Sequence, residues 1–178
     1  MEVDDVCQAK SNADAYGPET GLVSAELLSG GRSGAAAAES VATFPGERAG
    51  MSRHAVSSGG APAALGPYSQ AIVAGGFVFC SGMAGIDPAT GMAPDGIEAQ
   101  TEQALVNLAA VLEAAGASMA DVVKTTIFYD DVEDFGRLNE VYARHMPDPP
   151  PARSAPAHIR LPRGLLVSIE AIALAPST

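Results

Sequence analysis

The stretch Leu165-Leu-Val-Ser-Ile-Glu-Ala-Ile-Ala-Leu174 lies near the end of the 178-residue chain and decides its fold. Its β-branched and aliphatic side chains are typical of a β-strand, where successive side chains point to opposite faces of a sheet. Alternation predicts two apolar rows, Leu165, Val167, Ile169, Ala171 and Ala173 on one face and Leu166, Ile172 and Leu174 on the other. A strand that is apolar on both sides belongs inside a sheet that is covered on both faces.

The segments before this strand predict a regular series of strands and helices. Gly75 and Gly76 favour a hairpin turn, the spacing of Asp95 and Glu98 is that of a capping box, and Asp131 is placed to cap a second helix. In chain order the predicted elements are strands at 70–74 and 77–81, a helix at 95–115, a strand at 122–129, a helix at 131–142, and strands at 154–160 and 165–174.

Each predicted helix has one apolar stripe that must be covered, so both helices are expected on one face of a mixed sheet. The sequence therefore predicts an α+β fold. Because the helices cover only one face, we expect the other face of strand 165–174 to pack against further copies of the chain. A homo-oligomer of this kind can form ligand clefts at its subunit boundaries.

Residues 1–60 differ in composition from the rest of the chain. They are rich in Ala, Gly, Ser and acidic residues, as in Ser-Gly-Gly-Arg-Ser-Gly-Ala-Ala-Ala-Ala at 29–38. Such a segment buries too little apolar surface to offset the entropy lost on ordering. We expect a disordered, acidic Ala/Gly/Ser-rich extension at 1–60 and one folded domain at 61–176, with Met51 as a candidate for an alternative start.

The overall charge and the cysteines limit the classes of function. The net charge is −11, from 21 acidic and 10 basic residues, which argues against a nucleic-acid partner because such binding depends on neutralising phosphates. The sequence contains no apolar run long enough for a membrane helix and no signal-like N-terminus, so no membrane association is expected. Cys7 and Cys80 make no disulfide framework, so we expect a cytoplasmic protein in which Cys80 is a buried, unreactive thiol.

Arg153 and Glu170 stand out as charged residues in apolar surroundings. Arg153 follows Pro149-Pro-Pro-Ala152, a stiff approach, and a fixed guanidinium binds a small carboxylate through two parallel hydrogen bonds. Glu170 shares its face of the strand with apolar side chains, where it needs a bound proton or a cationic partner. The alternatives are a surface arginine paired with an acidic residue, and a structural ion pair between Glu170 and Arg153 or Arg163.

Four further residues are candidates for lining a binding site. Tyr68 can offer its phenol to a ligand or cap the core, and Asn139 can orient a ligand or a neighbouring loop. Ser81 and Gly82 allow a close approach of the backbone to a ligand, although a simple turn is an equal alternative. The three histidines lack the spacing of metal ligands and no phosphate-binding glycine motif is present, so neither a metal nor a cofactor is expected.

With these residues assembled, the chain resembles the reactive-intermediate deaminase family, also called RidA or YjgF-type. The matching segments between about Pro62 and Ala175 are Gly66-Pro-Tyr-Ser-Gln-Ala71, Ser81-Gly82, Pro88-Ala-Thr-Gly91, Gln100-Thr-Glu-Gln-Ala-Leu-Val-Asn107, Val123-Lys-Thr-Thr126, Asp134-Phe135 through Asn139, Pro151-Ala-Arg-Ser154 and Ile169-Glu-Ala-Ile-Ala173. The resemblance implies a chorismate-mutase-like subunit, a homotrimer whose sheets form a barrel inside the helices, and ligand clefts between subunits.

The resemblance also implies roles for the candidate residues. Arg153 would anchor the carboxylate of a substrate, and Glu170 would be the acid that positions water and moves protons. Tyr68 and Asn139 would line the cleft, and Ser81 and Gly82 would face the ligand. The reaction implied is the hydrolysis of enamine or imine acids such as 2-aminoacrylate to a 2-keto acid and ammonia, without a cofactor, because an imine carbon is already electrophilic.

Three positions depart from the pattern of the family and bear on substrate range. Met83, Ala155 and Ser168 stand where glutamine, cysteine and glutamate are common. Met83 is expected to make the cleft more apolar, so that it tolerates longer or aromatic imino acids. Two other functions stay open. One is a non-catalytic regulator that binds small keto or amino acids; the other is a ribonuclease or translation inhibitor, which the acidic composition disfavours.

Overall fold

The computed structural model describes residues 53–176, and these form a six-stranded mixed sheet with two helices. The strands are β1 (His54–Val56), β2 (Ala71–Ala74), β3 (Phe77–Ala84), β4 (Val122–Tyr129), β5 (Ala152–Ser154) and β6 (Val167–Leu174). The helices are α1 (Ile97–Ala114) and α2 (Phe135–His145), with short 3-10 turns at Met119–Asp121, Val132–Asp134 and Pro162–Gly164. The expected α+β class is confirmed. None of the helices in this range is long and apolar enough to cross a membrane.

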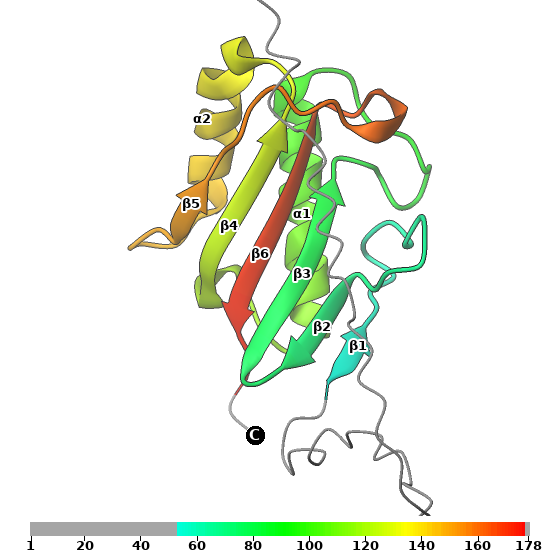
Figure 1. The fold of residues 1–178 in the computed structure, drawn as a ribbon, viewed down its shortest axis with the longest axis vertical. Coiled ribbons are helices and arrows are strands. Elements are labelled where there is room, and N and C mark those ends of the chain that lie inside the picture. Colours follow the sequence, from blue (N-terminus) through cyan, green and yellow to red (C-terminus); the bar gives the residue numbers. More distant parts are fainter. Residues whose placement is uncertain (1–52, 177–178) are drawn as a thin grey trace, which may run out of the picture. The chain divides into compact units, whose positions relative to one another are not determined.

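The strand order across the sheet is β1-β2-β3-β6-β4-β5 (Figure 1). Neighbouring strands run antiparallel except β4 and β5, which are parallel. The last strand of the chain, β6, thus lies between β3 and β4, as expected for a strand that is apolar on both faces. The short strand β5 forms one edge of the sheet.

Both helices cover the same face of the sheet (Figure 1). The side chains that β6 turns toward them are almost fully buried, and they are Val167, Ile169, Ala171 and Ala173. The core between the layers is completed by α1, with Leu105, Leu108, Val111 and Leu112, and by Leu138 and Val141 of α2. The two-face alternation predicted for 165–174 is therefore confirmed over β6.

The other face of the sheet bears no helix among the described residues, and we call it the open face. It is formed by side chains that alternate with the core positions, namely Ile72, Ala74, Phe77, Phe79, Lys124, Thr126, Phe128, Ser168, Glu170, Ile172 and Leu174. Phe77, Phe79 and Leu174 are 38%, 44% and 48% exposed. The open face is thus a largely apolar surface that carries two charged residues, Lys124 and Glu170.

Some predicted boundaries are wrong for local reasons. No capping box opens α1, since its N-cap is Gly96 at φ 85° and no side chain caps it. The strand predicted at 154–160 ends at Ser154, because Pro156 and the positive φ of His158 (61°) interrupt an extended run. Asp131 does cap the turn before α2, accepting a hydrogen bond from the backbone of Glu133 at 2.9 Å.

The N-terminal part of the chain is described only from residue 53. The strand β1 lies inside the segment 1–60 assigned to an extension, so residues 54–56 belong to the sheet, where β1 pairs with β2. Gln70, which is 5% exposed, ties this segment down: its Oε1 accepts from Ser58 N at 2.6 Å and its Nε2 donates to Pro62 O at 2.8 Å. The expectation for residues 1–52 lies outside the described residues.

Candidate functional site

Arg153 lies on the edge strand β5, on the helix side of the sheet. β5 pairs with β4 in a register that sets Arg153 beside Thr125, a fully buried residue of the core face. The guanidinium Nη1 donates to Asn139 Oδ1 at 2.8 Å, and its Cζ lies 4.8 Å from the ring centroid of Tyr142. The Phe135 ring is 5.7 Å away. Arg153 therefore has a defined orientation although it is exposed.

A pocket of about 620 Å³ adjoins the guanidinium. Its walls are mainly apolar or proline-rich and come from α2 and from the segment that leads into β5, with Asn139, Tyr142, Ala143, Met146, Pro147, Asp148, Pro150, Pro151 and Arg153. A pocket with apolar walls and one oriented guanidinium suits a small acid with an apolar side chain. Arg153 and Asn139, both predicted as site residues, are thus brought together.

Glu170 occupies the middle of β6 on the open face, opposite Thr126 of β4. It lines a smaller hollow of about 200 Å³ together with Lys124, Thr126, Ala171 and Ile172. The Lys124 Nζ donates to Thr125 O at 2.7 Å and to Ser154 Oγ at 3.1 Å. Lys124 is therefore a cation on the same face as Glu170. The sequence reasoning did not identify Lys124 as a candidate.

Arg153 and Glu170 lie on opposite sides of the sheet within one subunit. Arg153 faces α2, whereas Glu170 faces away from both helices, and β4 lies between their strands. Among the described residues neither side chain forms an ion pair, since the salt bridges there involve Arg137, Arg144 and His145. Within one subunit, therefore, Glu170 forms no structural ion pair with Arg153 or Arg163.

The remaining candidates, Tyr68, Ser81 and Gly82, lie together near β2 and β3. The Tyr68 hydroxyl accepts from Leu65 N at 3.0 Å, and the Ser81 Oγ donates to Ser69 O at 2.7 Å. Gly82 lies in the irregular register between Cys80 and Met83, where a Cβ would come within 2.5 Å of Ser168 Oγ. Three strand spacings separate β3 from β5, or about 14 Å, so these residues do not reach Arg153 in the same subunit.

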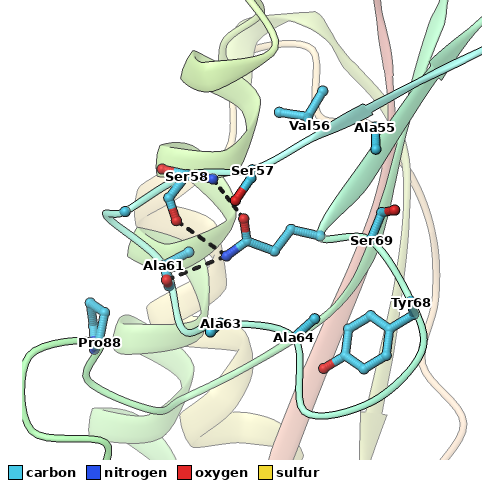
Figure 2. A pocket seen from close by; sticks show the side chains of 12 residues that line it. Ala55, Val56, Ser57, Ser58, Ala61, Ala63, Ala64, Tyr68, Ser69 and Pro88 are labelled. Carbon is cyan, nitrogen blue, oxygen red and sulfur yellow. Dashed lines mark hydrogen bonds between the residues drawn. The ribbon is translucent and has the colours of Figure 1, made fainter.

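Tyr68 borders two hollows. The larger, of about 600 Å³, lies between the β1 segment and the loop before β2, and Figure 2 shows Tyr68, Ser69 and Ser58 around it. The smaller is about 40 Å³ and is shared with Gly82 and Met83. The walls of both contain small and apolar residues, and among the described residues no cluster of His, Cys, Asp and Glu can hold a metal ion.

The three positions that depart from the family pattern have different surroundings. Met83 is 5% exposed and packs in the core, so it borders the small hollow beside Tyr68 but offers little surface to a larger cleft. Ala155 packs against the core, and Ser168 lies on the open face beside Gly82. The expectation that Met83 makes the cleft more apolar stays a prediction, and within one subunit the bulge at Ser81 and Gly82 turns Met83 toward the core.

Two further residues, Cys80 and Tyr142, are buried in the core. Burial raises the pKa of the Cys80 thiol to about 12, which confirms the expected buried thiol. Tyr142 is the last residue of the helix predicted at 131–142, and it is buried, yet its ring also lies under Arg153. The spacing of Asn139 and Tyr142, one helical turn apart, is the sequence signal that could have linked them.

Comparisons with known proteins agree with this geometry. A family model described as Endoribonuclease L-PSP matches residues 58–175. The chain is 45% identical to the mouse 2-iminobutanoate/2-iminopropanoate deaminase over 68% of its own length and 91% of the relative. It is 48% identical to the chloroplastic Reactive Intermediate Deaminase A of Arabidopsis thaliana, over 69% of this chain and 66% of that one.

A solved structure has the same fold. The crystal structure of Escherichia coli TdcF with bound serine superimposes with a TM-score of 0.65 at 37% identity, covering 69% of this chain and 99% of that one. The range matched by the family model, 58–175, contains strands β2 to β6, both helices and all the candidate site residues. The chain therefore belongs to the RidA (YjgF-type) family, whose model is described as Endoribonuclease L-PSP.

Proposed function

We propose that this protein hydrolyses reactive imine and enamine acids of the 2-aminoacrylate and 2-imino acid type to 2-keto acids and ammonia. The observation that carries the proposal is the oriented guanidinium of Arg153 beside a pocket of about 620 Å³, in a chain 45% identical to a 2-iminobutanoate/2-iminopropanoate deaminase. A guanidinium held by Asn139 and Tyr142 keeps one edge free for a carboxylate. The substrate class is therefore a small acid.

The reaction needs no covalent enzyme intermediate. The oxygen of a water molecule bonds to the imine carbon while the electron pair of the C=N double bond moves to nitrogen, which takes up a proton. The hydroxyl of the resulting carbinolamine then gives up its proton, and the leaving nitrogen takes up one proton as the C–N bond breaks, which leaves a 2-keto acid and ammonia. An enamine acid first becomes the imine, when its terminal carbon takes up a proton and its nitrogen gives one up. Arg153 holds the carboxylate, and Glu170 accepts the proton from water and returns it to nitrogen.

We propose that the complete site is composed of residues from two copies of the chain. Arg153 and Asn139 lie at the β5 edge on the helix side, whereas Glu170 lies on the open face and Tyr68, Ser81 and Gly82 lie beyond β6, so one small molecule cannot touch all of these residues within one subunit. The apolar open face, with Phe77 and Phe79 exposed, favours burial against other copies, as in the expected homotrimer. The bound serine named for TdcF supports a small amino-acid-like ligand.

Imines generated in place by an amino-acid oxidase provide the test. Wild type is expected to accelerate their hydrolysis, Arg153→Ala to lose most activity through a higher KM, and Glu170→Gln to lose it through a lower kcat. A wild-type protein that adds nothing to the spontaneous rate contradicts the proposal. If it nevertheless binds 2-keto acids, and Glu170→Gln binds them equally, the chain is a small-ligand binder.

The description of the family model contains the word endoribonuclease, and the same preparations should be tested on RNA. The net charge of −11 disfavours RNA binding, so no cleavage and no salt-dependent binding are expected. The cytoplasmic location inferred from the sequence stays a prediction, since one relative is chloroplastic.

A further inference from the structure

Tyr142 lies between the core and the proposed carboxylate anchor. It is 5% exposed, and its ring is the nearer of the two aromatic faces next to the Arg153 guanidinium, with Cζ 4.8 Å from the ring centroid. Its hydroxyl is 2.7 Å from Thr125 Oγ1, and Thr125 is fully buried. This hydrogen bond between two buried hydroxyls fixes the ring of Tyr142, because breaking it would leave both oxygens without a hydrogen-bond partner.

The pairing of β4 with β5 positions both Arg153 and Thr125, the residue whose hydroxyl binds Tyr142. Thr125 of β4 is the register partner of Arg153 on β5. The other contact of the guanidinium, Asn139, lies one turn before Tyr142 on α2, so both contacts come from one side of that helix. β4, β5 and α2 therefore meet around one guanidinium.

This arrangement holds the arginine without using the donors that a substrate needs. Stacking on a ring face uses no N–H group, and Asn139 takes one hydrogen of Nη1. Nε and Nη2 remain for two parallel hydrogen bonds to a carboxylate. Because the side chain is ordered on folding, less conformational entropy is lost when the substrate binds.

We infer that Tyr142 is a positioning residue, held by Thr125, that orders Arg153 for the carboxylate of the substrate. The inference rests on the proposed function, in which Arg153 is the anchor. Tyr142 also lines the pocket, but its contribution to substrate binding is made through Arg153 and therefore disappears when Arg153 is removed.

A double-mutant cycle tests the coupling, with KM and kcat measured on oxidase-generated imino acids. Tyr142→Leu is expected to raise KM about tenfold and to change kcat by less than about twofold. In the Arg153→Ala background the same substitution is expected to change KM by less than about twofold, because the partner is gone. Val141→Ala, a core truncation on the same helix away from Arg153, is the control and should leave KM unchanged.

Two milder variants keep the test decisive if Tyr142→Leu does not fold. Tyr142→Phe and Thr125→Val both keep the ring and remove the hydrogen bond that fixes it, so each is expected to raise KM about threefold. Unchanged KM in every folded variant overturns the inference. An increase in KM of the same size with and without Arg153 also overturns it.

Calorimetric binding of 2-oxobutanoate separates this inference from the proposed function, because binding needs no turnover. If wild type binds the keto acid but hydrolyses no imine, the proposed function fails, and the coupling between Tyr142 and Arg153 is then measured on binding. If wild type neither binds nor hydrolyses, Arg153 is not a carboxylate anchor and both are overturned.

Discussion

Cys80 is a thiol whose reactivity is suppressed by its place in β3. It is 7% exposed in the core, and burial raises its pKa to about 12, so at pH 8 only about one molecule in ten thousand carries the reactive thiolate. We expect the Cys7→Ser variant, which retains Cys80 alone, to show no reaction with a disulfide reagent in the native state and one thiol per chain in denaturant. Rapid native labelling would contradict this assignment.

The sequence identified Arg153 and Glu170 but not their relation. The period of two along 165–174 was enough to place Glu170 on the open face, because that period depends only on local backbone geometry. The side of the sheet that Arg153 faces depends on the parallel pairing of β5 with β4 and on the position of α2. Those are long-range contacts, so the sequence alone could not exclude an ion pair between the two residues.

The packing of α1 on the end of β3 depends on Gly85. A Cβ at this position would lie 2.3 Å from Gln100 O and 2.6 Å from Gln100 Cα, both backbone atoms that can move only with the helix. Gly85→Ala is therefore expected to lower the free energy of unfolding by about 2 kcal/mol or more, measured by urea denaturation. Gly136→Ala is the matched control, since a Cβ there meets nothing within 4 Å, and it should be neutral or stabilising.

Asn107 links the contact between α1 and the end of β3 to the candidate site. Its Nδ2 donates to Ala84 O at 2.9 Å and to Ile86 O at 2.8 Å, so α1 holds the backbone just after β3. Ser81 and Gly82 lie on the same strand. A loss of packing at Gly85 is therefore expected to lower activity as well as stability, whereas Gly136→Ala should leave activity unchanged.

An ion-pair cluster joins α1 to the end of α2. Glu102 Oε1 lies 2.8 Å from His145 Nε2, and Glu102 Oε2 lies 3.2 Å from Arg144 Nη2. The hydrogen bond with His145, and to a lesser extent the one with Arg144, holds the pKa of the Glu102 carboxyl below its ordinary value of 4.5. A carboxyl with a lowered pKa stabilises the folded state above the unfolded pKa, and this stabilisation is lost as the pH falls through the folded-state value.

Glu102→Gln is therefore expected to be less stable than wild type at pH 7 and to approach it below pH 4.5. The side chain of Glu102 is 45% exposed, so screening by solvent limits the loss at pH 7 to about 0.5 kcal/mol. Urea denaturation across this pH range measures the difference, with Glu113→Gln, an exposed acid on the same helix, as control. A stability difference that is independent of pH would rule out an electrostatic origin.

The elements that the sequence predicted well are those whose pattern is local. The helix over 95–115 and the strand over 122–129 were found within a few residues, because each has its own apolar period. The capping box predicted at Asp95 is wrong, because the N-cap of α1 is Gly96, which has a positive φ and no side chain to cap the helix. β1 could not be foreseen, because its three residues are held by pairing with β2, while the buried amide of Gln70 holds Ser58 just after them.

The proposed two-copy site makes a prediction about mixed assemblies. Arg153→Ala and Tyr68→Ala each damage a different half of the site, and the two halves lie about three strand spacings apart in one subunit. Each homogeneous variant is therefore expected to have low activity. In a co-expressed mixture, each cleft takes its Arg153 half from one chain and its Tyr68 half from the next. The cleft is intact when the Arg153 half comes from a Tyr68→Ala chain and the Tyr68 half comes from an Arg153→Ala chain.

With equal amounts of the two chains, random assembly into closed rings gives about one intact cleft in four. The co-expressed mixture should then show about a quarter of the wild-type kcat per site, with the wild-type KM. Mixing the two variants after purification, without subunit exchange, is the control and should give no recovery. Failure of the co-assembled mixture to regain activity, with mass spectrometry confirming that the oligomers contain both chains, would mean that each site is built within one subunit.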